Sequence, residues 1–238
     1  MSSDSVARRS GRVRLVVVVL AAFATVGLCA LGVWQVERRT WKLDLIERVE
    51  ARIHATPVAA PGPDAWPAIG VQDEYRRITA SGHFLNDRET LVQAVTDLGG
   101  GFWVLTPFET TGSFTVLVNR GFVPPDERAP ASREATGETS ITGLLRLSEP
   151  GGGFLRSNDP GADRWFSRDV EAIASARGLT EVAPYFIDAD ATANPGGFPV
   201  GGLTVVRFNN NHLVYALTWF ALAGMAALGG FTVWRRRI

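Results

Sequence analysis

A single ionisable ring, that of His212, stands where a polar stretch meets an apolar segment near the C-terminal end of the chain. The stretch reads RFNNNHLVYALTWFALAG from Arg207 to Gly224, and almost nothing polar follows the histidine. A neutral imidazole is a common metal ligand. Ionisable side chains at membrane depth are candidates for function because their desolvation is costly, although the cost is small at the membrane surface. Two interpretations stay open: His212 decorates the interface, or it binds a ligand there.

The segment after His212 presents small and aromatic residues on the face of a helix that it shares with the histidine. Small residues leave a flat strip along which a planar macrocycle or another helix could lie close. Tyr215 and Trp219 are also of the type that anchors helices at membrane interfaces. At 3.6 residues per turn the face holds Ala216, Trp219, Ala223, Ala227 and Gly230, with Tyr215 on its flank. The first apolar segment of the chain offers Ala21, Ala24, Gly27 and Leu31 for helix packing.

The remaining sequence contains few patterns that carry catalysis. It has no GxSxG or HExxH motif, and its two glycine triplets are not followed by the residues of a phosphate-binding loop. Cys29 is the only cysteine, which excludes an intrachain disulfide and a CxxC site. Asp159, Asp163 and Asp169 stand in sequence of the kind where carboxylates usually form turns and salt bridges. We therefore expect no catalytic site, and we expect His83 to be a strand-end residue.

Two apolar segments decide the broad class of the protein. They run for about 22 uncharged residues from Leu15 to Val36 and about 21 from Leu213 to Val233. A helix needs about 20 apolar residues to cross a bilayer, so each segment can span once. The first is longer than the apolar core of a signal peptide, and we expect it to be retained as an anchor. Arginines precede the first segment and follow the second, which predicts that both ends lie in the cytoplasm.

These segments divide the chain into five parts. We predict a cytoplasmic tail at 1–14, a transmembrane helix at 15–36, an extracytoplasmic domain at 37–211, a second transmembrane helix at 212–234 and a cytoplasmic tail at 235–238. The expected location is the inner (plasma) membrane of a bacterium, with the main domain in the periplasm and the lipid bilayer as a partner. Lys42 is the only lysine, which indicates GC-rich DNA. Basic and acidic residues balance at 24 each, so nothing indicates a nucleic acid partner.

The region between the apolar segments predicts a sheet-rich domain. Glu37–Ile53 has apolar residues at four-residue spacing, which predicts an amphipathic helix that continues out of the membrane. Short apolar or alternating runs follow, typical of a largely antiparallel sheet that could curl into a barrel. The stretch SRDVEAIASARGL predicts one helix, with Ser167 as its cap and Gly178 as its stop. Asn119-Arg120-Gly121 is expected to form a tight turn. The predicted strands are 75–84, 90–95, 102–108, 114–122, 140–147, 185–188 and 203–208. The fold class is thus membrane-anchored α+β, with two transmembrane helices flanking one mostly antiparallel domain.

Five stretches in order along the chain resemble the Surfeit-locus cytochrome oxidase assembly family. LGVWQVERRTWK is similar to the LGxWQxxRxxxK signature that follows the family's first span, and YRRITASGHF to its Y-x-R-x-x-x-x-G-x-F strand. VLVNRGFVP, RSNDPGADRWFSRDVEAIA and NNNHLVYALTWFALA are similar to three further elements. Each match alone is modest. Five in register, from about residue 31 to 223 and with the same two-span topology, identify the chain as a member.

The resemblance implies an assembly factor that acts while haem a enters the catalytic subunit of an aa3-type cytochrome c oxidase. Bacterial members are linked to haem a binding, and the suspected axial iron ligand corresponds to His212. On this interpretation Tyr215 and Trp219 would orient the haem edge, and Trp34 could stack beside the histidine. Arg207 would meet a haem propionate, with interfacial snorkelling as its alternative. A homodimer partner or the oxidase subunit could supply a sixth ligand, and haem A synthase is a further expected partner.

Other function classes stay open at this point. A haem-free chaperone could clamp the oxidase subunit with the same surface, and it would tolerate the loss of His212. An extracytoplasmic sensor is a second alternative, but the tails outside the two spans are short, and we expect no cytoplasmic output module. An enzyme of the cell envelope is a third alternative, and it lacks a recognisable nucleophile and base.

Overall fold

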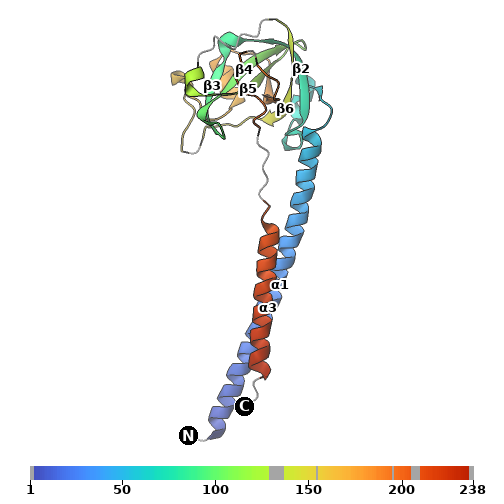
Figure 1. The fold of residues 1–238 in the computed structure, drawn as a ribbon, viewed down its shortest axis with the longest axis vertical. Helices are drawn as coiled ribbons and strands as arrows, with labels where there is room; N and C mark the ends of the chain where they lie inside the picture. Colours follow the sequence, from blue (N-terminus) through green and yellow to red (C-terminus); the bar gives the residue numbers. More distant parts are fainter. Residues whose placement is uncertain (1–2, 129–136, 154, 195, 205–209, 236–238) are drawn as a thin grey trace. The chain divides into compact units, whose positions relative to one another are not determined.

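The computed structural model describes residues 3–128, 137–153, 155–194, 196–204 and 210–235. The chain forms two compact units (Figure 1). One unit combines Met1–Arg48 with Arg207–Ile238, and the other is Val49–Val206. The first contains the long apolar helices and the second contains the sheet.

The helical unit consists of two helices that are long and apolar enough to cross a membrane. Helix α1 runs over Ser3–Ile53 and helix α3 over His212–Arg235. In the most apolar 18-residue stretch of each helix, only 6% (α1) and 11% (α3) is buried inside the protein. The core helix of a soluble protein would be mostly buried. Apolar side chains without a protein partner at this length suit lipid as the surrounding medium. The predicted continuation of the first apolar segment through Ile53 is confirmed, because α1 is one helix.

Small residues bring the two helices into contact. A Cβ atom on Gly230 would lie 2.8 Å from the Cβ of Ala21, and one on Gly32 would lie 2.6 Å from the ring of Phe220. Glycine at both positions therefore lets the backbones approach closely, as in other membrane helix pairs. Later positions in α1 meet earlier positions in α3, so the two helices are antiparallel. The buried residues of α3 are Ala216, Ala223 and Gly230.

The predicted contact faces are confirmed for most of α3 and wrong for most of α1. Ala227 of α3 is exposed, and so are Ala24, Gly27 and Leu31 of α1. Small residues occur all around the first apolar segment, so their types alone do not mark the face that meets α3. The less exposed residues of α1 recur at steps of three and four, near the 3.5-residue period of helices that pack with a left-handed crossing. Between residues 18 and 35 they are Val18, Ala21, Thr25, Leu28, Cys29, Gly32 and Gln35.

The second unit is built on one curved sheet whose central strands close into a barrel (Figure 1). The sheet order is β1-β2-β6-β7-β5-β4-β3, and β2 also pairs with β4, which closes a ring of β2, β6, β7, β5 and β4. Pairing is antiparallel except between β1 and β2 and between β5 and β7. The predicted barrel-like, mostly antiparallel sheet is confirmed. The strands are β1 Val58–Ala59, β2 Arg77–Phe84, β3 Thr90–Thr96, β4 Gly99–Thr110, β5 Thr115–Val123, β6 Thr139–Leu147 and β7 Val182–Ala189.

Two apolar clusters cover the two faces of this sheet. Side chains alternate along a strand, so Val116 and Val118 of β5 join one cluster while Leu117 joins the other. The second cluster also takes in Ile173 of helix α2, which covers that face. Every residue of β5 is buried as a result. A strand covered on both faces tends to read as a continuous apolar run, and β5 does so on either side of Asn119 and Arg120, which are buried polar residues.

Helix α2, Val170–Ala176, lies between β6 and β7 in the chain and ends where it was predicted to end. Gly178 has φ +62°, a left-handed conformation that suits glycine after the last turn, and the Leu179 amide donates to Ala174 O at 2.9 Å. The predicted cap was wrong. Asp169 accepts from the Ala172 amide at 3.1 Å, whereas Ser167 Oγ accepts from the Gly152 amide. The helix begins two residues later than expected, so the cap moves with it.

Two further predictions about the domain differ from the structure. Asn119-Arg120-Gly121 lies inside β5 and forms no tight turn. Gly121 has φ +131°, and a Cβ atom there would lie 2.1 Å from Val200 O, so glycine is needed for a close backbone approach. The last predicted strand, 203–208, is not a strand at Leu203 and Thr204, and the rest of it lies outside the described residues. The short 3-10 helices are η1 Pro63–Ala68, η2 Val71–Asp73, η3 Asn86–Arg88, η4 Pro125–Glu127 and η6 Pro160–Ala162.

Candidate functional site

His212 is the first residue of α3 and makes a side-chain contact with α1. Its Nδ1 lies 2.7 Å from Oε1 of Gln35, and both residues are partly buried. The helix begins here because the Tyr215 amide donates to Asn211 O at 3.3 Å, which leaves His212 on its first turn. The contact joins two residues that are 177 positions apart in the sequence.

The contact favours one protonation pattern of the ring. With the amide oxygen of Gln35 facing Nδ1, the contact is a hydrogen bond when Nδ1 carries the proton, because an amide oxygen only accepts. In that neutral tautomer the lone pair belongs to Nε2. This nitrogen is on the far side of the ring from Gln35. His212 therefore offers one oriented nitrogen donor at one end of an apolar helix pair.

The other predicted site residues lie in different environments. Tyr215 is 54% exposed, Trp219 is partly buried on the face that includes Ala216 and Ala223, and Trp34 is 53% exposed. The predicted neighbour of His212 in the WQ pair was Trp34, but Gln35 makes the contact. Arg207 lies outside the described residues. The structure thus brings His212 together with a residue that the sequence did not single out.

Gln35 could have been noticed from its surroundings in the sequence. It is an amide near the end of a run of about 22 uncharged residues, 15–36, where most neighbours are aliphatic. A polar side chain at this depth needs a hydrogen-bond partner, since lipid offers none. The partner could not be predicted, because the register between two distant helices depends on how they pack.

Within the part of the chain that is described, no group of three or more His, Cys, Asp or Glu side chains could together hold a metal ion. A metal site made only of side chains therefore does not fit these residues. A macrocycle that brings its own equatorial donors does fit, because it needs only one or two axial ligands from protein. The helix pair meets this requirement, because His212 can supply one axial nitrogen.

The three aspartates of the turn-rich region have structural partners. Asp159 accepts from Arg164 at 2.7 Å, and this hydrogen bond lowers the pKa of the Asp159 carboxyl. Asp163 accepts from the indole of Trp165 at 2.8 Å, and Asp169 caps α2. His83 lies in β2 with Nε2 3.1 Å from Glu109 on the surface. Each of these four side chains therefore has a structural partner.

A buried polar cluster around Asp188 was not predicted. Asp188 is 3% exposed and accepts from Asn119 at 2.8 Å, Arg146 at 2.9 Å, Arg168 at 3.2 Å and Thr204 at 3.0 Å. Both guanidinium groups also lie near the ring of Phe186, which is fully buried. Burial lowers the pKa of the Arg146 guanidinium, but the attraction of Asp188 and its other acidic neighbours outweighs burial and raises that pKa overall. The cluster joins β5, β6 and β7 and is satisfied internally, as a structural element of the barrel.

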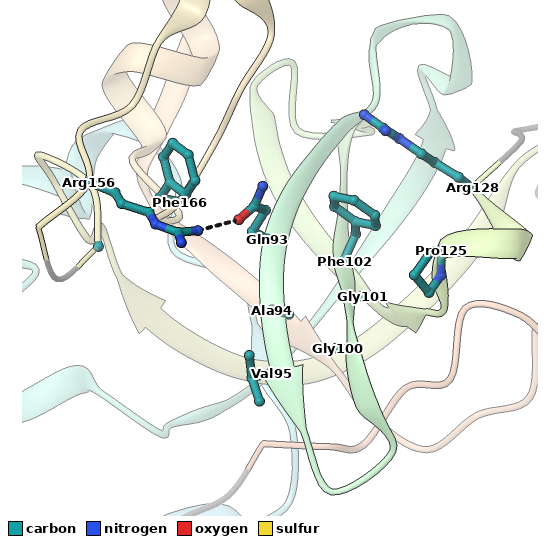
Figure 2. Close-up of a pocket in the computed structure, with 11 residues that line it drawn as sticks. Gln93, Ala94, Val95, Gly100, Gly101, Phe102, Pro125, Arg128, Arg156 and Phe166 are labelled. Atoms are coloured by element: carbon teal, nitrogen blue, oxygen red, sulfur yellow. Dashed lines mark hydrogen bonds between the residues drawn. The ribbon is translucent and has the colours of Figure 1, made fainter.

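A surface groove of about 660 Å³ lies at the β3–β4 hairpin (Figure 2). Figure 2 shows Arg156 donating to Gln93, a hydrogen bond of 3.1 Å. The guanidinium of Arg128 lies 4.7 Å from the ring of Phe102, and that of Arg156 lies 5.5 Å from Phe166. Among the described residues that line it there is no carboxylate, histidine or cysteine. The described part of the lining therefore supplies no group for acid–base chemistry or for holding a transition metal.

Comparison with known proteins gives consistent matches over most of the chain. The model of the SURF1 family matches residues 22–224, a range that contains both Gln35 and His212. The chain is 38% identical over 226 residues to Surfeit locus protein 1 of Mus musculus, covering 87% of this chain and 72% of that protein. It is 38% identical over 213 residues to Surfeit locus protein 1 of Homo sapiens, covering 81% and 69%. It is 36% identical over 212 residues to the SURF1-like protein of Monosiga brevicollis, covering 82% and 78%.

Proposed function

This chain belongs to the SURF1 family, and we propose from that membership that it is an assembly factor for an aa3-type haem-copper cytochrome c oxidase. We propose further that it binds haem a and assists its insertion into the catalytic subunit. In this role the chain holds and hands over a cofactor and is not an enzyme, because no bond of the haem changes.

One observation carries the haem part of the proposal. His212 stands at the start of a helix that can span a membrane, and its Nδ1 lies 2.7 Å from Gln35 Oε1, an arrangement that favours a lone pair on Nε2. Haem a is lipophilic, so a donor at the end of an apolar helix pair is where such a ligand could be received from the bilayer. The bound haem would supply four equatorial nitrogen donors and the iron, and His212 would supply an axial ligand.

A single protein ligand suits delivery. Each further axial bond between protein and iron would slow the release of haem. A carrier that must give up its haem therefore releases it faster when it supplies one axial ligand. Tyr215 and Trp219 would contact the edge of the macrocycle, and Arg207 would pair with a propionate through its planar guanidinium. A sixth iron ligand would come from a second protomer or from the oxidase subunit.

The proposed location is the inner membrane of a bacterium, with both termini in the cytoplasm and the barrel domain in the periplasm. Two helices long and apolar enough to span a membrane support an anchored protein. Arginines outside both apolar segments support the orientation. The proposed partners are the catalytic subunit of the oxidase and haem A synthase, each of which shares the membrane with this chain.

Complementation of a deletion strain tests the assembly role. We expect loss of this chain to lower the haem a content of membranes and the activity of cytochrome c oxidase, and the wild-type gene to restore both. His212→Ala should restore little of either, whereas His83→Ala, at a surface pair outside the helices, should restore both. Full restoration by His212→Ala would favour the haem-free clamp. An intact oxidase in the deletion strain would overturn the assembly role.

A further inference from the structure

We propose that Gln35 is a positioning residue that sets the protonation and orientation of the His212 ring, so that the first helix controls how strongly the second can hold a metal. The effect on metal binding rests on the proposed haem role of His212. The effect on the tautomer of the ring, through an interhelical hydrogen bond, is independent of that role.

The helix packing explains why Gln35 reaches His212. Gly32 lies one turn before Gln35 on the same face of α1, and its missing side chain makes room for the ring of Phe220. The close approach at Gly32 brings the α1 backbone next to α3. From there the glutamine side chain spans the remaining gap, and its Oε1 lies 2.7 Å from Nδ1 of His212.

The hydrogen bond acts on the ring in two ways. In water a neutral histidine exchanges between its two tautomers, but an acceptor beside Nδ1 selects the form that is protonated there. The same bond restricts ring rotation and makes Nε2 a better donor to a metal. A glutamine is uncharged, so it strengthens the donor less than a carboxylate at the same place would. This intermediate strength suits a ligand that must bind haem and later release it.

A purely structural role for the contact makes different predictions. An interhelical hydrogen bond strengthens helix association whatever the tautomer of the histidine. If the bond only joins the helices, replacing Gln35 would weaken packing but leave the properties of His212 unchanged wherever the helices stay together. Measurements on the His212 ring itself therefore distinguish the two roles.

The first measurement needs no haem. The chain has three histidines, so the full-length protein with His54→Gln and His83→Gln can be labelled with ¹⁵N-histidine and studied in detergent by NMR. We expect His212 to be protonated at Nδ1. Gln35→Leu should move the proton to Nε2, and Gln35→Glu should keep it at Nδ1. Thr25→Val is the control, because Thr25 Oγ1 bonds to Ala21 O within α1.

A His212 ring protonated at Nε2 in the parent protein would overturn the proposal. So would an Nδ1–H ring that is unchanged by Gln35→Leu in a protein whose far-UV circular dichroism matches the parent. The Thr25→Val control should leave the ring signals where they are, and a shift in that variant would mean that any polar change in α1 moves them.

The second measurement is the rate at which bound haem leaves the protein. Loss of a group that orients a metal-binding histidine typically weakens metal affinity about 10–100-fold. We expect Gln35→Leu to transfer its haem to an apo-globin acceptor faster by a factor in that range, and Gln35→Glu to transfer it more slowly than the wild type. Equal rates for all three would contradict the proposal. If the wild type binds no haem, the proposed function fails, and the NMR measurement still decides the role of Gln35.

Discussion

The chemistry available to a histidine depends on which of its ring nitrogens carries the proton. For His212 the group that lies beside Nδ1 belongs to the other helix, since Gln35 Oε1 is 2.7 Å away. A proton on Nδ1 would make this contact a hydrogen bond and leave the lone pair on Nε2.

The Asp188 cluster predicts a large effect of a single substitution. Asp188→Ala would leave Arg146 and Arg168, both 14% exposed, without the carboxylate that lies between them. Removing one partner of a buried ion pair costs about 3–5 kcal/mol, and the loss should lie at the lower end of that range because Glu74 and Glu149 still pair with the arginines. We expect a loss of this size in the free energy of unfolding, measured by urea denaturation in detergent. Asp87→Ala, at a side chain that is 80% exposed, should change it by less than about 0.5 kcal/mol.

Tyr185 predicts a dependence of stability on alkaline pH. Burial raises the pKa of its phenol above the ordinary value of 10.0, and its O–H donates to Pro61 O at 2.8 Å. The contribution of the neutral phenol to the stability of the folded state is therefore complete below about pH 10. It is lost as the pH rises, because Tyr185 loses its phenol proton at a lower pH in the unfolded chain than in the folded protein. The free energy of unfolding of the wild type should fall with pH more steeply than that of Tyr185→Phe, by up to about 1.4 kcal/mol per pH unit. Parallel slopes above pH 10 would contradict the assignment.

At the residue scale the sequence predicted His212 but not its partner. A lone imidazole beside an apolar segment is visible in one dimension, and so are Tyr215 and Trp219. The contact with Gln35 depends on the register of two helices that are far apart in the chain. The Asp188 cluster was missed for the same reason, because its members come from separate strands and loops.

At the scale of elements, the helix pair depends on two glycines that face side chains of the opposite helix. Antiparallel packing at Gly32 and Gly230 holds α1 and α3 in the register that the Gln35–His212 contact needs. Neighbouring glycines of α3 do not share this constraint, since a Cβ atom on Gly224 or Gly229 would meet nothing within 4 Å. The pair therefore offers a matched comparison.

We expect Gly230→Ala to destabilise the helix pair and Gly229→Ala to leave it unchanged or more stable. The new Cβ at 230 would lie 2.8 Å from that of Ala21, an overlap that typically costs about 1–3 kcal/mol. At 229 the alanine meets open space and favours helix by roughly 1 kcal/mol. The midpoint of thermal unfolding in detergent, followed by circular dichroism, checks both. Equal midpoints would show that Gly230 is not a packing constraint.

Most strands of the domain were predictable because burial leaves a pattern in the sequence. Runs such as 90–95 and 140–147 match β3 and β6 closely, since their ends are marked by glycine, proline or acidic residues. The prediction of a tight turn at Asn119-Arg120-Gly121 was wrong. Gly121 lies within β5, where the absence of a side chain allows the close approach of Val200 O. Closure of the barrel follows from pairing between β2 and β4, which local sequence does not encode.

At the scale of the whole molecule, the chain is an apolar helix pair and a barrel domain that are joined through α1 and through the segment before α3. The predicted boundary at residue 37 reflects where the apolar run ends, whereas the compact units divide near Val49. The difference arises because α1 continues as one helix beyond its apolar part.

Cysteine labelling tests that placement. In a Cys29→Ser background we expect Asp87→Cys, on the surface of the barrel domain, to react with a membrane-impermeant maleimide in intact spheroplasts. Ser10→Cys, before the first apolar segment, should react only after the membrane is opened. The opposite pattern would reverse the proposed orientation, and reaction of both cysteines in intact spheroplasts would exclude a cytoplasmic N-terminus.

The most direct test of haem binding is purification of the full chain from cells that also make haem A. The visible spectrum and the extracted haem of the wild type would be compared with those of His212→Ala and of the surface control His83→Ala. We expect haem a to copurify with the wild type and with His83→Ala, and to be largely absent from His212→Ala. Equal haem in all three proteins would contradict His212 as the axial ligand, and its absence from all three would contradict the carrier role.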